Sequence, residues 1–302
     1  MADDSLTDCS ECVPPTEAFS VVANETRLSI LEALWAAEDR PVSFTTLRKA
    51  VGVDDSAQFN YHLKELRGQF VRKVEDGYDL QYAGRAVIHA VLAGTLNEHP
   101  TIGPFEVEGT CIDCDATLQA RYEDEQFRVD CADCGRVHAH FPFPPGGLEG
   151  RDEQEAMAAF NQRARHLTCL SADGVCPRCG GRVEVGFVEG EATCMDLSVV
   201  VKHDCQRCDA TVRTSAGLAL LDHADVVSFY RDHGVDLNAR AFWTLPWVVG
   251  DRHTTVRSRD PWRVELAIHQ DDEVLRVTLD ESLQVVESER DTTTAADRKS
   301  VA

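Results

Sequence analysis

The chain contains little lysine, no long apolar run and none of the short motifs that mark common catalytic sites. No stretch approaches the ~18 apolar residues of a membrane span, and residues 1–12 are acidic and polar, unlike a secretory signal peptide. We therefore expect a cytoplasmic protein that does not bind membranes. A phosphate-binding glycine loop, a nucleophile elbow and an open three-ligand metal site are also missing, which argues against an enzyme.

The scarcity of lysine accompanies a strong acidic excess. Only five of the 30 basic residues are lysines, and 52 acidic residues give a formal net charge of −22. This composition is typical of a high-salt cytoplasm, where the Debye length of about 3 Å at 1 M salt screens self-repulsion. Residues 43–85 are the exception, because seven bases against six acids leave them at +1 and the remainder at −23. This segment is the one suited to an anionic partner.

A helical pattern lies within that segment, at residues 56–66. Phe59, Leu63 and Leu66 are spaced i, i+4 and i+7, so they predict one buried stripe. Asn60 and the residues around it then point away from the stripe. An amide, a phenol and a cation facing outward suit a groove of DNA, although a solvated helix face is the alternative. The candidate DNA-binding residues here and in the following hairpin are Ser56, Gln58, Asn60, Tyr61, Lys64, Arg67, Arg72 and Lys73.

The neighbouring segments predict helices before this one and a hairpin after it. Residues 16–37 have a helical apolar pattern, and a shorter helix begins after Ser43, a plausible N-cap, and ends at Gly52. Residues 54–56 offer caps for the next helix. Residues 70–74 and 78–82 are strand-like, with a turn at 75–77 in which Gly77 can take a positive φ. A basic pair on the first strand is what a wing needs to contact phosphate.

This order of elements resembles the winged helix-turn-helix domain of arsenic-repressor-like (ArsR-type) transcription regulators, particularly the acidic versions from halophilic archaea. The resemblance covers residues 16–97 and is carried by segments 23–31, 60–66 and 82–84, which include Asn24-Glu25-Thr26-Arg27, Asn60-Tyr61-His62-Leu63 and Tyr82-Ala83-Gly84. It implies binding of double-stranded DNA. The predicted recognition helix has no cysteine pair, so the arsenic or cadmium site of that family is not carried over.

The helix predicted at residues 83–97 is apolar nearly all round and must therefore be covered. A second copy of the chain or the C-terminal region can cover it, and the resemblance favours a homodimer. Residues 97–104, with Pro100, Gly103 and Pro104, are expected to form a linker.

Twelve cysteines in a cytosolic chain indicate metal binding rather than disulfides. Eight form four Cys-x-x-Cys pairs, and each two successive pairs can complete a tetrahedral four-thiolate site. We therefore expect two structural zinc ions per chain, in two zinc ribbons; redox dithiols and an iron–sulfur cluster are the alternatives. The predicted ligands are Cys111, Cys114, Cys131 and Cys134 in the first site, and Cys176, Cys179, Cys205 and Cys208 in the second.

The knuckle sequences repeat, in inverted order. Residues 114–118 match 208–212, and residues 134–137 match 179–183. Other candidate ligands are weaker: Cys9 and Cys12 lie in an acidic tail, while Cys169 and Cys194 are isolated and expected in the core. His138, His140 and His203 lie near the knuckles, but four thiolates already complete each site.

Outside the knuckles the signals are structural. We expect helices at 152–168 and 224–233, a strand at 191–203, and a hairpin of strands 264–268 and 274–279 with a third strand at 283–288. Trp243, Trp247 and Trp262 suit core packing better than a ligand pocket.

The predicted fold class is α+β, with a winged helix-turn-helix followed by a mostly β region that carries two zinc ribbons. Its parts are a disordered tail at 1–15, the DNA-binding domain at 16–97, the first ribbon at 105–147, a helix with the second ribbon and a hairpin at 148–288, and a disordered tail at 289–302. The function this favours is a DNA-binding transcriptional regulator whose C-terminal region senses an effector ligand or contacts a protein partner. The alternative is a scaffold for protein contacts in the transcription machinery.

Overall fold

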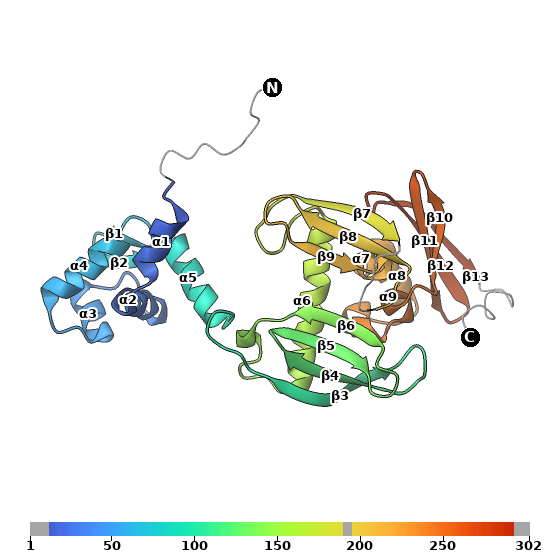
Figure 1. Cartoon of the computed structure of the whole chain (residues 1–302), viewed down its shortest axis with the longest axis horizontal. Helices are drawn as coiled ribbons and strands as arrows, with labels where there is room; N and C mark the ends of the chain where they lie inside the picture. The colour runs from blue at the N-terminus through green and yellow to red at the C-terminus, as the bar shows by residue number, and fades with distance from the viewer. Residues whose placement is uncertain (1–11, 190–194, 293–302) are drawn as a thin grey trace, which may run out of the picture. The chain divides into compact units, whose positions relative to one another are not determined.

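The computed structural model describes residues 12–189 and 195–292, and the chain divides into two compact units, residues 1–97 and 98–302 (Figure 1). The first unit contains α1 (Pro15–Val22), α2 (Glu25–Ala36), α3 (Phe44–Val51), α4 (Ser56–Leu66), β1 (Val71–Val74), β2 (Gly77–Leu80) and α5 (Tyr82–Leu92). The single helical pattern expected over 16–37 is two helices. The chain breaks at Ala23 because the Asn24 side chain caps α2, accepting a hydrogen bond from the Arg27 N–H at 3.2 Å.

Caps set the bounds of α3 and α4. Ser43 accepts a hydrogen bond from the Thr46 N–H, which confirms the predicted N-cap. Gly52 ends α3 with a φ of 74°, a conformation that glycine adopts without strain. Asp55 then caps α4, accepting from the N–H groups of Ala57 and Gln58 at 2.7 and 3.2 Å. These caps fix the short turn between the two helices.

The hairpin β1–β2 pairs Val71 with Leu80 and Val74 with Gly77. Gly77 was expected to supply a positive φ in the turn, but its φ is not positive. The reason for glycine is space, since a Cβ there would lie 2.4 Å from the carbonyl oxygen of Val42. Val42 also bridges Tyr78 through two backbone hydrogen bonds of 2.9 Å. The hairpin is thereby joined to the segment that precedes α3.

The core of the first unit is formed by α2, α3, α4 and the hairpin, including Leu31, Leu47, Phe59 and Leu63. The helix expected at 83–97 is shorter, and the first unit covers only part of it, as its apolar pattern predicted. Helix α5 ends at Leu92 and buries only Gly84 and Ile88 among the residues described. Its Tyr82 and Leu92 are 88% and 53% exposed.

The second unit begins with an antiparallel sheet of β3 (Ile102–Thr110), β4 (Thr117–Glu123), β5 (Gln126–Cys131) and β6 (Val137–Pro142), in that order. The predicted linker 97–104 therefore ends sooner, because β3 already includes Gly103 and Pro104. Proline is tolerated at this point since β3 is an edge strand whose register shifts between Ile102 and Phe105.

Helix α6 (Glu153–Ala172) connects this sheet to a second one, made of β7 (Val183–Glu189), β8 (Val199–Cys205) and β9 (Thr211–Thr214). The helix starts at a capping box of Asp152 and Glu155. Its Phe160 packs against Phe127 of the first sheet. The strand expected over 191–203 is β8, which begins later, and residues 190–194, with Cys194, lie outside the described residues.

A third antiparallel sheet contains β10 (Thr254–Arg259), β11 (Trp262–Gln270), β12 (Glu273–Asp280) and β13 (Val285–Thr292). Strand β10 was not predicted from the sequence, and the disordered tail predicted from Glu289 is wrong as far as Thr292, where β13 ends. The rest of that tail and residues 1–11 lie outside the described residues. Along the chain, five short helices connect the second sheet to the third: α7 (Ala216–Leu220), α8 (Ala224–Asp232), η2 (Leu237–Ala239), η3 (Phe242–Thr244) and α9 (Pro246–Val249). A further short helix, η1 (Pro145–Gly147), follows β6.

One hydrophobic core joins the three sheets of the second unit with α6. Trp243 and Trp247 are 2% and 3% exposed, which confirms core packing for both, and Trp262 is half-buried against Phe187. The fold is α+β, as expected. In the part of the chain described, no helix has both the length and the apolar character needed to cross a membrane.

Candidate metal centres and nucleic-acid interface

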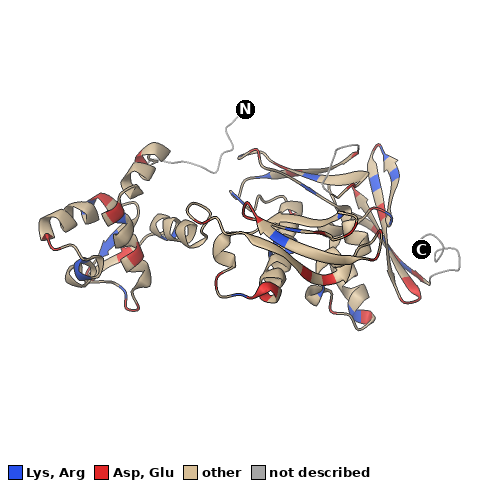
Figure 2. Ribbon diagram, turned by 60° about the horizontal axis from the view of Figure 1, so that its bottom comes forward, with Lys and Arg blue, Asp and Glu red and all other residues tan. Residues whose placement is uncertain are grey.

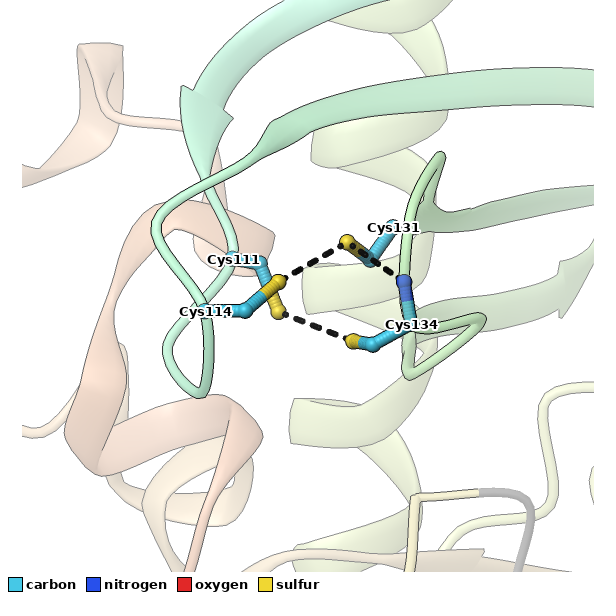
Figure 3. Close-up of side chains that lie close together, drawn as sticks. All are labelled: Cys111, Cys114, Cys131 and Cys134. Atoms are coloured by element: carbon cyan, nitrogen blue, oxygen red, sulfur yellow. Dashed lines mark hydrogen bonds between the residues drawn. The ribbon is translucent and has the colours of Figure 1, made fainter.

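The first cysteine cluster lies at one end of the first sheet. Cys111 and Cys114 flank the turn from β3 to β4, while Cys131 ends β5 and Cys134 precedes β6. Figure 3 shows the four side chains pointing toward one another from these two turns. The sulfur atoms of Cys111 and Cys134 are 3.6 Å apart, and those of Cys114 and Cys131 are 3.4 Å apart. The structure thus brings together all four residues predicted for this site.

The second cluster is built in the same way at the second sheet. Cys176 and Cys179 lie between α6 and β7, Cys205 ends β8 and Cys208 precedes β9. The sulfur atoms of Cys176 and Cys208 are 3.8 Å apart, and those of Cys179 and Cys205 are 3.5 Å apart. The longer spacing between these two pairs is taken up by β7, the following loop and β8.

Both clusters have the size of a tetrahedral metal site. Zinc–sulfur bonds of ~2.3 Å place sulfur atoms about 3.8 Å apart at the corners of a tetrahedron. The sulfur–sulfur distances of 3.4–3.8 Å approach that value and far exceed the ~2.05 Å of a disulfide. Two clusters of four thiols can therefore each hold a metal such as zinc.

All four knuckles share one backbone frame, which explains the sequence repeat. The residue after the second cysteine has a positive φ in every knuckle, at Asp115, Gly135, Gly180 and Asp209. The first cysteine of each knuckle donates its N–H to the carbonyl five residues on, at 2.8–3.0 Å. Aspartate and glycine are among the residues that tolerate this left-handed conformation. The matching Cys-Asp-Ala-Thr and Cys-Gly segments therefore reflect the turn that the knuckle requires.

Backbone N–H groups inside the knuckles favour the thiolate form. The N–H of Cys134 donates to the sulfur of Cys131 at 3.4 Å and lowers the pKa of that thiol to about 7. The N–H of Arg207 donates to the sulfur of Cys205 at 3.4 Å, and the pKa of Cys205 falls to about 6. The neighbouring sulfurs outweigh such a hydrogen bond at Cys114 and Cys179, whose pKa values rise to about 12. Each cluster thus has one thiol that ionises readily, and the thiolate is the form that binds metal.

The weaker candidates stand apart from the clusters. His138 and His203 are buried, but their ring nitrogens contact the Trp243 carbonyl and the Thr214 hydroxyl, each at 3.0 Å. Cys169 is half-buried on α6 rather than in the core, so the core interpretation is wrong for it. Cys9 lies outside the described residues.

Helix α4 presents the predicted DNA-binding side chains on its outer surface. Phe59, Leu63 and Leu66 are buried, as predicted. The six predicted residues on or just after α4 are all exposed, namely Ser56, Gln58, Asn60, Tyr61, Lys64 and Arg67. Arg72 and Lys73 are exposed on β1. Among the described residues, Lys64, Arg67 and Lys73 form no ion pair with a carboxylate.

Two arginines of this unit have structural partners that the sequence analysis missed. Arg72 lies opposite Asp79 in the hairpin register and pairs with it at 2.6 Å. Arg48 donates to the carbonyls of Val53 and Asp54 and so holds the turn between α3 and α4. Figure 2 shows acidic and basic residues interspersed over this unit. The alternation of the hairpin would have placed Asp79 opposite Arg72, whereas nothing in the sequence marked Arg48.

Comparison with known families finds one match in each unit, and both matches are to domains of unknown function. Residues 15–91 match a domain of unknown function (DUF7347), and residues 108–285 match a second domain of unknown function (DUF7351). No curated protein and no solved structure matches the chain. The second match spans more than half of the sequence and includes both cysteine clusters, and the chain therefore belongs to the DUF7351 family.

Proposed function

We propose that the first unit is a winged helix-turn-helix that binds double-stranded DNA, and that the protein is an ArsR-like transcriptional regulator. Helix α3, a short capped turn and helix α4 follow one another, and the β1–β2 hairpin comes next. This is the element order of a helix-turn-helix with its wing. In this proposal α4 is the recognition helix.

The outer face of α4 is the observation that carries the proposal. Asn60 can form two hydrogen bonds with adenine, and Tyr61 and Lys64 can reach neighbouring bases or phosphates. Tyr61 is 55% exposed, so much of a large aromatic ring faces outward beside its edge contact with His62. A partner with polar edges and an anionic backbone suits this combination better than water does. The near-neutral charge of residues 43–85 in an acidic chain supports the same partner.

We further propose that the metal in both clusters is zinc and that its role is structural. Four cysteine sulfurs at tetrahedral spacing are the usual donor set of structural zinc. With all four positions taken by protein, no site remains for a substrate or a water. The metal in each cluster would hold together two turns that are also linked by the pairing of adjacent strands, β4 with β5 and β7 with β8.

A homodimer through α5 is part of the same proposal. Tyr82 and Leu92 are exposed on this helix, and Leu96 just after it is 74% exposed. Apolar side chains at such exposure gain free energy when a second copy covers them. A dimer would also present two copies of α4 to the two halves of a symmetric DNA site.

Binding to a library of genomic DNA fragments at several salt concentrations tests the central proposal. We expect selective retention of a subset of fragments by the zinc-loaded chain. Absence of binding at every salt concentration would contradict DNA recognition and favour a scaffold that contacts other proteins. Comparing bound sites with and without candidate effectors then tests whether the C-terminal region senses a ligand.

A further inference from the structure

The two metal clusters differ in charge at equivalent positions of the same frame. The residue just before the second cysteine of each knuckle is Asp113 or Asp133 in the first cluster, and Arg178 or Arg207 in the second. All four side chains are exposed at the ends of their sheets. Because the knuckle backbones match, these positions are directly comparable. The backbone frame thus accepts either charge, and the sequence assigns opposite charges to the two clusters.

A third arginine joins the pair of the second cluster. The carbonyl of Arg182 accepts a hydrogen bond from the Gln206 N–H at 2.9 Å, which places Arg182 beside the knuckle that contains Arg207. Gly181 lies under the same knuckle, since a Cβ on it would be 2.7 Å from the Cβ of Arg207. Arg178 lines one small crevice together with Cys205. Arg178, Arg182 and Arg207 therefore form one cationic surface, called the arginine tip below.

The arginine tip lacks the acidic partners that nine other arginines of the second unit have. Arginine side chains paired with a carboxylate within 4.0 Å are those of Arg121, Arg128, Arg136, Arg165, Arg252, Arg257, Arg259, Arg276 and Arg290. Within residues 12–189 and 195–292, Arg178, Arg182 and Arg207 form no ion pair. Arg163 and Arg231 are also exposed and form no ion pair with another described residue, so what distinguishes the tip is that its three guanidinium groups come from neighbouring turns. They are available to an external anion.

Charge compensation of the metal centre is the simplest alternative explanation. Four thiolates around a divalent ion carry a net charge of −2, and nearby arginines would reduce it. The first cluster has the same four thiols, yet it carries Asp113 and Asp133 where the second carries Arg178 and Arg207. Its nearby arginines, Arg136 and Arg252, are both paired to Asp113, at 2.8 and 2.9 Å. A four-cysteine knuckle pair of this kind therefore does not depend on unpaired arginines. The charge of the tip calls for another explanation.

We propose that the arginine tip binds the phosphate backbone of double-stranded DNA, as a second contact in addition to the one made by the first unit. Guanidinium groups form paired hydrogen bonds with phosphate oxygens, and exposed turns let several of them follow a backbone. Contacts of this kind add affinity without reading sequence. The inference rests on the proposed DNA-binding function in that both units contact the same duplex.

The test compares two charge-matched variants of the full-length, metal-loaded protein. R178D/R207D places in the second cluster the residues that the first cluster carries, so the knuckles should still fold. R163E/R231E changes the net charge equally, at two exposed arginines of α6 and α8 that form no ion pair with another described residue. Affinity is measured on a preferred duplex and a scrambled duplex across a series of salt concentrations, together with zinc content.

We expect R178D/R207D to bind both duplexes roughly tenfold more weakly. The slope of log affinity against log salt concentration should become shallower by about 1.8, at ~0.9 per lost phosphate contact. Zinc content should stay at the wild-type value, and R163E/R231E should behave like wild type. Equal losses in both variants would show an effect of net charge alone and overturn the proposal. Unchanged affinity would overturn the proposal. Loss of zinc with an unchanged salt dependence would overturn it in favour of charge compensation. If the wild type binds neither duplex, the proposed function itself fails.

Discussion

At the scale of single residues, a substitution of Asn60 tests whether α4 reads the DNA sequence or only places the protein on the DNA. The Asn60 side chain is exposed on α4, off the buried stripe of Phe59, Leu63 and Leu66. We expect N60A to lose about 1–3 kcal/mol of binding free energy at the preferred site and much less on unrelated DNA. Stability should barely change. Paired titrations on specific and scrambled duplexes measure this difference, and equal losses on both would mean that α4 only positions the protein.

The two basic residues of β1 should contribute unequally, because only Lys73 lacks a carboxylate partner among the described residues. We expect K73A to weaken binding to all sequences alike and to lower the salt slope by about 0.9. R72A should have a smaller effect, since Asp79 already offsets the charge of Arg72 at 2.6 Å. Titrations of both variants with DNA at several salt concentrations show which one loses more affinity. A larger loss of affinity in R72A than in K73A would contradict the prediction.

Asp79 also links the stability of the first unit to pH. Its burial raises the pKa of the carboxyl, but the hydrogen bonds from Arg72 and the Leu80 N–H outweigh burial, so the pKa lies below the ordinary value of 3.8. A carboxyl whose pKa is lower in the folded than in the unfolded state stabilises the fold. That stabilisation is complete at pH values above the unfolded-state pKa and is lost as pH falls through the folded-state pKa. We expect D79N to unfold more easily than wild type at pH 7.

The comparison is made by chemical unfolding of both proteins from pH 7 down to pH 3. Acid effects elsewhere in the chain are common to both, so the difference between the two curves isolates this carboxyl. It should shrink toward pH 3. A difference that is constant across the range would show that charge on Asp79 does not matter.

At the scale of elements, α5 offers the clearest test. Leu92 is exposed while Ile88 is buried in the core of the unit, so L92D should disturb a dimer without disturbing the fold. Val87 packs partly against that core and is a poorer choice. We expect wild-type dimers and L92D monomers at micromolar concentration in sedimentation experiments. The matched control is L170D, at an exposed leucine of α6 in the second unit, and a wild-type monomer would contradict the dimer.

Elements with a local signal were predictable from the sequence, and elements set by distant contacts were not. Capping residues predicted the bounds of α3 at Ser43 and Gly52, and apolar periodicity predicted the buried stripe of α4. The spacing of the cysteines predicted both clusters. Strand β10 was missed because its six residues are too short for their alternating pattern to predict a strand, and the strand is stabilised by pairing with β11. The role of Gly77 depends on Val42, far from it in sequence, and no turn rule contains that contact.

At the scale of the whole molecule, we expect bound metal to be required for the folding of the second unit. Structural zinc contributes on the order of 10 kcal/mol in small domains, and both clusters lie at sheets that share one core. We expect two zinc ions per chain by elemental analysis and loss of the second unit's tertiary structure on chelation. Iron in carefully reduced protein, or less than one metal per chain, would contradict zinc. Unchanged structure after complete chelation would contradict the structural role.

The two units have separate hydrophobic cores, one within residues 30–88 and one within residues 111–279. If the proposed roles hold, a chain deprived of zinc would keep its first unit folded while its second unit is lost. Such a chain would still occupy its operators, yet it could no longer deliver whatever the second unit contributes. Zinc starvation would then convert the protein into a competitor of its own intact copies, one weakened by the loss of the phosphate contact that the arginine tip adds.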